Sequence, residues 1–407
     1  MKRIVLAVAM VVLLCSTVVA LAQAIQRIST PQTGEPTRGI MYSSILNDTR
    51  SSVESQETAN PADSFWESAD VPAIHVPEEV DSISAAVLEL ADYGRVIVAA
   101  GEYRDNVVIL RGRKISIEAE EGAIPVIVPA NPELPILHAE PDAELLVVGV
   151  SLRGSRAALL LGSLDEIEPA RRVVLANTHV ADSEYGIYGA AREFELQRCI
   201  VEHNAYGIIL GGSSVLADSI IQDNGWNVVL SGNNRPGCDE AAYSTNDSQV
   251  AIKNVTIWHG HDGGIAICNV AKATVQNVYL WKNSYVGILI YNTPSYTLTA
   301  SSIGETQLWN GMWGDGLQVI HSTGQIFNNQ FSANKRANVI FYGNSGGAIY
   351  ANMLIYSVFS ICMDGAGGYW PSPTILSNYI FGNTEDRICT GSKLPSSPPP
   401  TVPPPSL

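Results

Sequence analysis

The chain has 407 residues, 46% of them hydrophobic, which is enough for a large buried core and at most a few domains. Its formal net charge is −16 and no basic run occurs, so nucleic acid is not an expected partner. An acidic protein also repels polyanions at long range, and a polyuronate ligand would need a local basic patch or a bridging cation.

The N-terminus has the composition of a targeting segment. Met1-Lys2-Arg3 precede an apolar run over residues 4–22, and Ala22-Gln23-Ala24 supplies the small-residue pattern of a cleavage site. This predicts a secretory signal peptide over residues 1–24. The alternative is an uncleaved membrane anchor, because the run is nearly long enough to cross a bilayer. No later segment could cross, so we expect a secreted, cell-surface or periplasmic protein without membrane insertion after cleavage.

Two segments flank the predicted folded domain. Residues 25–72 are rich in Ser, Thr, Pro, Asn and acidic residues and show little periodicity, which predicts a solvated, disordered linker. Residues 393–407 end in "PSSPPPTVPPPSL", a proline-rich tail that favours polyproline II. The folded domain is therefore expected over residues 73–392.

The folded domain opens with one amphipathic helix. In "DSISAAVLELADYG" the apolar residues recur at helical spacing, with Asp81 or Ser82 as the N-cap and Gly94 as the end. Short runs rich in β-branched residues follow, such as "RVIVAAG" and "ELLVVGVSL", and they predict strands. No further convincing helix follows.

A short unit then recurs, mostly every 20 to 28 residues. It is seen in "VLANTHV" (174–180), "ELQRCIV" (195–201), "VLADSII" (215–221), "AIKNVTI" (251–257), "TVQNVYL" (274–280), "QIFNNQF" (325–331), "IYANMLI" (349–355) and "ILSNYIF" (375–381). Roughly ten residues later a second short strand recurs, as in "GIILG" and "GILIYN". A unit this short cannot bury its apolar face unless it stacks on its neighbours. The repeat predicts a parallel β-solenoid with coils about 4.8 Å apart.

Alternation and stacking predict how each coil is filled. Ile252, Val255 and Ile257 should point inward. Asparagines that recur at turns tolerate left-handed geometry and can hydrogen-bond along the stack. They are Asn177, Asn254, Asn277, Asn328, Asn352 and Asn378 at the fourth position of the unit, with Arg198 and Asp218 as substitutes, and Asn204, Asn224, Asn283 and Asn334 six positions later. The opening helix should cover the exposed edge of the first coil.

The stretch "GRVIVAAGEYRDNVVILRGRKISIEAEEG" (94–122) and the later units resemble right-handed parallel β-helix proteins of the pectin-lyase-like superfamily. The resemblance covers residues 73–392 and implies an all-β, right-handed parallel β-helix with an N-terminal capping helix. It also implies a range of roles, from polysaccharide lyases, glycosidases and epimerases to non-catalytic proteins. The segment 259–261 is similar to the Gly-His-Gly element of polygalacturonases, and Asp239-Glu240 stands in place of the paired aspartates of that family. Its Asn-Thr-Asp and Arg-Ile-Lys elements are absent.

The two residues after each seven-residue strand should form a column at an outward corner. The pairs are Ala181-Asp182, Glu202-His203, Gln222-Asp223, Trp258-His259 and Trp281-Lys282. Trp258 and Trp281 could stack on sugar rings, with His203 as a further ligand contact. We expect the candidate catalytic residues to be Glu202, Asp223, His259, Asp262 and Lys282, because carboxylates and histidine can act as general acid and base. Glu202 and Asp223 on adjacent coils could form the carboxylate pair of a retaining glycosidase. The alternative is a solvated corner without function.

The longest insertion in the repeat region, residues 232–248, offers Arg235 and Tyr243 as further substrate contacts. No cofactor motif is evident. Calcium is the ion that scattered aspartates would suit, and His259, His261 and Asp262 could share a metal. Cys362 and Cys389 occupy the same place in adjacent coils and are candidates for a disulfide, as are Cys238 and Cys268.

Three functions remain open on the sequence. The first is an exported protein that binds a polysaccharide or surface glycan along the Trp258–Trp281 edge, and that cleaves it if it is a lyase or glycoside hydrolase. The second is a non-catalytic, adhesin-like or structural β-helix, which the missing family motifs favour. The third is periplasmic metal handling. The sequence carries no signal for an oligomeric state.

Overall fold

The computed structural model describes residues 65–66, 70–163, 168–232, 238, 246–309, 311, 313–365, 369–385 and 388–390. All of them belong to residues 59–407, the second of two compact units of the chain. Arg235 and Tyr243, predicted as substrate contacts, lie outside the described residues.

One helix, α4 (Ile83–Glu89), lies at the same end of the unit as β1 (Ala73–Val76), and its Ser82 side chain accepts the Ala85 amide as N-cap. The predicted helix is thus confirmed. Its predicted end is wrong, because the helix stops at Glu89 and Gly94 lies inside β2 (Tyr93–Val98). Within the described residues, no helix is long and apolar enough to span a membrane.

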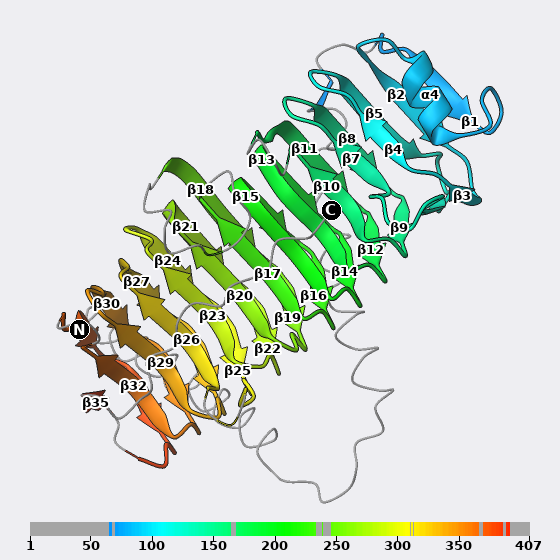
Figure 1. Ribbon diagram of the computed structural model, residues 1–407. Coiled ribbons are helices and arrows are strands. Elements are labelled where there is room, and N and C mark those ends of the chain that lie inside the picture. The colour runs from blue at the N-terminus through cyan, green and yellow to red at the C-terminus, as the bar shows by residue number, and fades with distance from the viewer. Residues whose placement is uncertain are drawn as a thin grey trace, which may run out of the picture. The chain divides into compact units, whose positions relative to one another are not determined.

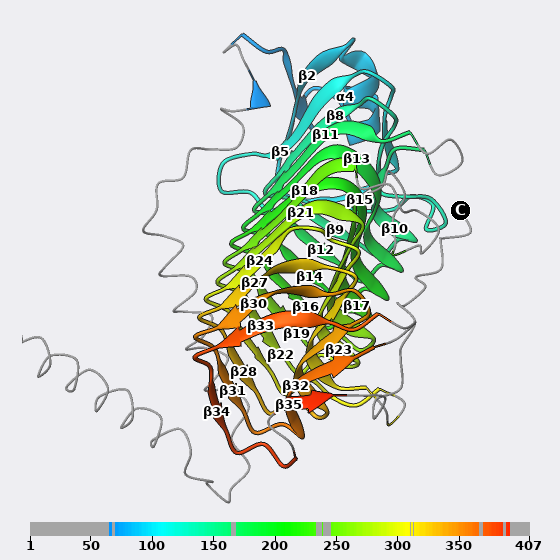
Figure 2. The same ribbon diagram turned by 90° about the vertical axis from the view of Figure 1, so that its left-hand side faces the viewer.

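Short parallel strands form a 12-stranded sheet in which the spatial order follows the chain. Its strands are β3 (Glu102–Arg104), β6 (Val126–Val128), β9 (Ser151–Arg153), β12 (His179–Ala181), β14 (Ile200–Glu202), β16 (Ile220–Gln222), β19 (Thr256–Trp258), β22 (Tyr279–Trp281), β25 (Ser302–Gly304), β28 (Gln330–Ser332), β31 (Met353–Ile355) and β34 (Tyr379–Phe381). Figures 1 and 2 show these strands side by side along the stack.

The remaining strands form a 23-stranded parallel sheet. They are β1 and β2 with β4 (Val107–Ile109), β5 (Lys114–Ala119), β7 (Leu137–Ala139), β8 (Glu144–Val148), β10 (Ala157–Leu161), β11 (Ala170–Ala176), β13 (Tyr185–Gln197), β15 (Tyr206–Ala217), β17 (Trp226–Ser231), β18 (Asn246–Lys253), β20 (Gly263–Cys268), β21 (Val270–Gln276), β23 (Val286–Tyr291), β24 (Tyr296–Thr299), β26 (Asp315–Ile320), β27 (Thr323–Phe327), β29 (Ala337–Tyr342), β30 (Gly346–Tyr350), β32 (Phe359–Asp364), β33 (Ser372–Leu376) and β35 (Ile388–Thr390). The long strands β13 and β15 join two ladders within this sheet. Each coil thus pairs with the next on every side, which confirms the predicted parallel β-helix.

The core is the interior of the stack. Ile252, Val255 and Ile257 are buried, as predicted from alternation. In the 12-stranded sheet the middle residue of each short strand points inward, as Leu280 and Phe331 do with no exposed surface. The residues on either side of it therefore point outward, because side chains alternate along a strand.

The turn before each short strand depends on a left-handed residue and a polar ladder. Asn177, Asn254 and Asn277 have φ of 50°, 56° and 52°, a region that asparagine tolerates better than most residues. Arg198 and Asp218 adopt the same geometry as predicted substitutes.

For the last two coils the predicted register is wrong by one residue. The left-handed positions there are Ala351 and Ser377. Asn352 and Asn378 instead continue the ladder of Asn329, since the Asn329 and Asn352 amides each donate to the next asparagine's Oδ1 at 3.0 Å. The Asn204–Asn224 ladder is confirmed, because the backbone amide of Asn204 donates to Asn224 Oδ1 at 2.9 Å.

Two disulfides, Cys238–Cys268 and Cys362–Cys389, confirm the predicted cysteine pairs. Cys199 is a buried free thiol. Burial raises the pKa of Cys199 to about 12, so the thiol stays protonated and unreactive at neutral pH.

The ladder asparagine Asn329 yields a stability prediction. Its Nδ2 donates to the carbonyls of Leu298 and Phe327, and its Oδ1 accepts the Ser301 amide at 2.9 Å. Asn329→Ala leaves buried polar groups unpaired, and we expect it to lower the free energy of unfolding by about 2 kcal/mol or more. Gln330→Ala, one residue on but outward-facing, should cost less than about 0.5 kcal/mol. Urea denaturation measures both, and equal costs would contradict the ladder's role.

Candidate functional site

The corner column predicted from the sequence is present. Strand register stacks Ala181, Glu202, Gln222, Trp258 and Trp281 in that order. The residue after each one has a positive φ, so every coil turns at this point in the same way. These residues are Asp182 (58°), His203 (56°), Asp223 (52°), His259 (49°) and Lys282 (54°).

Three aromatic rings gather on the outer face of the 12-stranded sheet. Tyr279 stacks on Trp281 with centroids 5.5 Å apart and planes 9° apart. Trp258 lies 6.4 Å from Tyr279 at 19°. We call Trp258, Tyr279 and Trp281 the first aromatic cluster. Tyr279 was not among the predicted site residues, although it precedes Trp281 by two residues and therefore shares its face of the strand.

Gly304 allows Trp281 to lie over the next coil. It is the register partner of Trp281 on β25, and a Cβ at Gly304 would come within 2.1 Å of the indole ring. The missing side chain therefore gives the indole its place on the sheet surface.

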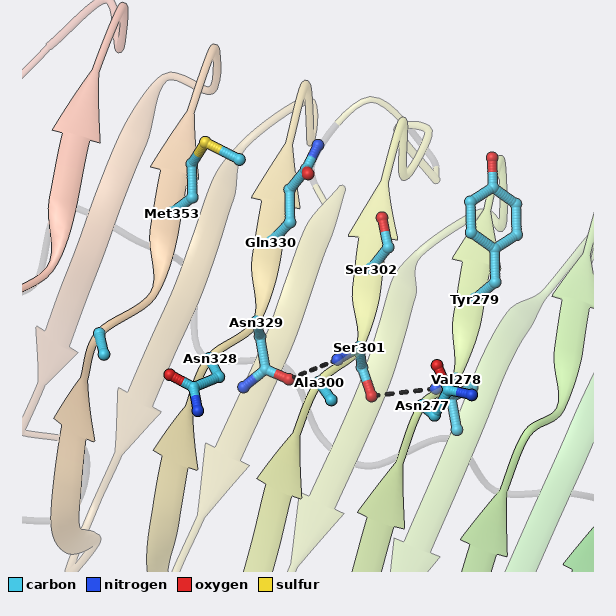
Figure 3. Close-up of a pocket in the computed structure, with 11 residues that line it drawn as sticks. Asn277, Val278, Tyr279, Ala300, Ser301, Ser302, Asn328, Asn329, Gln330 and Met353 are labelled. Carbon is cyan, nitrogen blue, oxygen red and sulfur yellow. Dashed lines mark hydrogen bonds between the residues drawn. The ribbon is translucent and has the colours of Figure 1, made fainter. Parts of the chain in front are cut away.

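A groove continues from the first aromatic cluster along the same face (Figure 3). It has a volume of about 420 Å³, and Tyr279, Ser302, Gln330 and Met353 from successive short strands line it. In the described part of the chain, the Ser302 and Gln330 side chains form no hydrogen bond, so both can serve a ligand. A left-handed turn column forms the other wall, with Asn277, Ala300, Asn328 and Ala351.

The predicted catalytic carboxylate Glu202 belongs to a polar chain. Its Oε1 lies 3.0 Å from His179 Nε2, and its Oε2 accepts the Gln222 amide at 2.7 Å. Arg153 donates to His179 Nδ1 at 3.0 Å, which fixes His179 as the neutral tautomer with its proton on Nε2, because arginine can only donate. His203 lies further out, 3.9 Å from Glu202. Glu202 is therefore held as an acceptor by scaffold residues.

Asp223 has a different partner. Its Oδ1 lies 3.2 Å from His259 Nδ1, which must donate, leaving His259 Nε2 as an acceptor. Burial lowers the pKa of His259, and this outweighs the opposing hydrogen bond and charge of Asp223. Lys282 Nζ lies 5.4 Å from the Trp258 ring centroid. A neutral imidazole thus sits beside the first aromatic cluster and could accept a proton.

Other predicted site residues do not join this arrangement. His261 is exposed and is fixed through its backbone amide, which donates to the Asn224 carbonyl at 2.9 Å. The Asp262 amide likewise donates to the Gly225 carbonyl at 2.9 Å. Among the described residues, no group of three or more His, Cys, Asp or Glu side chains could hold a metal ion.

Comparison with known proteins agrees with this architecture. Residues 185–355 match the family model of the right handed beta helix region. The A-module of the mannuronan C-5 epimerase AlgE6 of Azotobacter vinelandii is similar at 15% identity and a TM-score of 0.52, with 78% of this chain and 95% of that chain covered. The A-module of AlgE4 from the same organism has the same identity and TM-score, with 78% and 94% covered.

A variant of the periplasmic alginate epimerase AlgG is similar at 10% identity and a TM-score of 0.50, with 76% of this chain and 84% of that chain covered. At these identities the likeness shows the fold. No curated protein matches the sequence. The chain therefore has the fold of a right-handed parallel β-helix.

The His259–Asp223 pair yields a pH prediction. We expect proton NMR to give His259 a pKa below its ordinary value of 6.5. Because the folded-state pKa is depressed, the stability linked to His259 is present above pH 6.5 and is lost as the pH falls through the lower value. Asp223→Asn removes the hydrogen bond and the charge that favour the imidazolium, so it should lower the pKa of His259 further. A pKa that rises in this variant would contradict the assignment.

Proposed function

We propose that the protein is exported and binds a polysaccharide or surface glycan on the outer face of its 12-stranded sheet. The observation that carries this proposal is the first aromatic cluster at the end of the groove. Flat rings offer an apolar face to the apolar face of a pyranose ring. The groove adds unpaired hydroxyl and amide groups where sugar hydroxyls need partners.

The structural neighbours give independent support for this class of ligand. They are named as epimerases of mannuronan and alginate, which are polysaccharides. Binding alone would suit an adhesin-like or structural role, since the first aromatic cluster and the groove need no catalytic group.

Acid–base catalysis is the second candidate, and the His259–Asp223 pair favours it. An oriented, neutral imidazole beside the ring of Trp258 is suited to accept a proton from a bound sugar. Glu202 is less suited to act as a general acid, because both of its oxygens accept hydrogen bonds from the scaffold. Release of reducing ends or unsaturated products from a bound polymer, lost in His259→Gln, would establish turnover.

The binding proposal predicts a loss of affinity in aromatic variants. A polymer is first chosen on a glycan array, and affinity is then measured by tryptophan fluorescence and calorimetry. Tyr279→Ala or Trp281→Ala should each weaken binding about tenfold, which corresponds to about 1.4 kcal/mol. Trp370→Ala is the control, because that indole is 60% exposed and lies outside the 12-stranded sheet.

Unchanged affinity in both aromatic variants would place the ligand elsewhere on the molecule. Absence of binding to every glycan of the array would remove the proposal itself.

A further inference from the structure

A second group of aromatic rings lies on the same sheet face. Tyr356, Tyr379 and Phe381 are 55%, 61% and 54% exposed. Tyr379 and Phe381 have centroids 6.4 Å apart at 26°, and Tyr356 meets Phe381 edge-on at 5.9 Å. We call these three residues the second aromatic cluster. The three rings are in contact with one another, and contiguous exposed apolar surface is a feature of interaction sites.

Strand register places the first aromatic cluster, Tyr379 and Phe381 on the same two columns, which we call the outer strip, and Tyr356 lies in the turn that follows β31. The first column is Thr256, Tyr279, Ser302, Gln330, Met353 and Tyr379, and the second is Trp258, Trp281, Gly304, Ser332, Ile355 and Phe381. Five steps separate the ends of each column, a backbone distance of about 24 Å at about 4.8 Å per step. The groove lies between Tyr279 and Tyr379, because Ser302, Gln330 and Met353 line it and occupy the middle of the first column.

The outer strip contains no charged residue. None of its members is Asp, Glu, Lys, Arg or His, although the chain carries a net charge of −16. The earlier strands of the same sheet differ, since they carry Glu102, Arg104, Arg153 and Glu202 on the same face. Lys282 and Glu305, in the turn column beside the strip, balance each other in sign.

The absence of charge limits the chemistry of the ligand. A carboxylated or sulfated polymer is bound by cationic side chains that pair with its anionic groups, and the outer strip supplies none. Its apolar rings, hydroxyls and amide instead suit sugars that carry only hydroxyl groups.

We infer that the ligand is an uncharged linear polysaccharide that lies along the coil axis and contacts both aromatic clusters across the groove. This inference rests on the proposed function and adds the charge, the direction and the extent of the bound polymer. A ligand held at both ends should gain affinity with length, because the second contact forms at high effective concentration.

The test compares polymers by charge and then by length, on the full-length protein. Soluble glucan, xylan and mannan are compared with polymannuronate and polygalacturonate at low and high salt. Binding of a neutral polymer with little salt dependence is the expected result. Preferential, salt-sensitive binding of an acidic polymer would overturn the inference and leave the proposed function intact.

A size ladder of the bound neutral polymer tests its extent. For the longest oligosaccharides, Tyr379→Ala combined with Phe381→Ala should weaken binding about tenfold, as Trp281→Ala does. For the shortest that bind at the first aromatic cluster, only Trp281→Ala should matter. The control is Leu376→Ala, an exposed apolar residue of the same coil that lies on the other sheet.

The other binding results would contradict the inference. If affinity does not rise with oligosaccharide length, the ligand contacts only the first aromatic cluster and the inference is overturned. The same holds if the combined Tyr379→Ala and Phe381→Ala variant binds the longest oligosaccharides as tightly as the wild type. Failure to bind any polymer would remove the proposed function, and the inference with it. Because Tyr379 and Phe381 are exposed, their variants should melt at the wild-type temperature, which verifies that they fold.

Discussion

Backbone hydrogen bonding from each coil to the next is the constraint on which the rest of the structure depends. It fixes the distance between coils and places equivalent residues directly above one another. The effect of a residue therefore depends on the residues above and below it in its column as well as on its neighbours within the coil. Gly304 shows this, because its missing side chain gives room to an indole from the preceding coil. The same constraint turns separate aromatic residues into clusters and gives the sheet face a fixed spacing.

The repeat was sufficient to predict a parallel β-solenoid, its inward face and the corner column, since all three follow from the period of the unit. The register of the last two coils was not predictable, because Ala351 and Ser377 take the left-handed position and the asparagine follows one residue later, whereas in coils such as that of Asn277 the asparagine is itself left-handed. That shift of one residue also hid the second aromatic cluster, since it moved Phe381 away from the outward position. Tyr279 was not predicted because it begins β22, whereas the predicted corner column consists of the two residues that follow each seven-residue unit.

Glu202 and Asp223 show that two carboxylates at the corners of neighbouring coils need not share a partner. Glu202 ends a strand in extended geometry, whereas Asp223 follows a strand in the left-handed region. They belong to neighbouring columns, and each finds its own partner: His179 with Gln222 for Glu202, and His259 for Asp223. The side-chain contacts that decide this depend on rotamers, which the repeat period does not specify.

The protein is acidic as a whole, but its outer strip is uncharged, so long-range repulsion and short-range binding come from different parts of the molecule. Net negative charge acts at long range, where it keeps molecules apart and repels polyanions. Stacking and neutral hydrogen bonds act only at contact, and salt hardly affects them. Their strength grows with the number of coils that present suitable residues, because each coil adds one step of fixed length. In a solenoid, the length of such a surface is set by the number of repeats that carry it. Its selectivity is set by the residues that occupy its two columns.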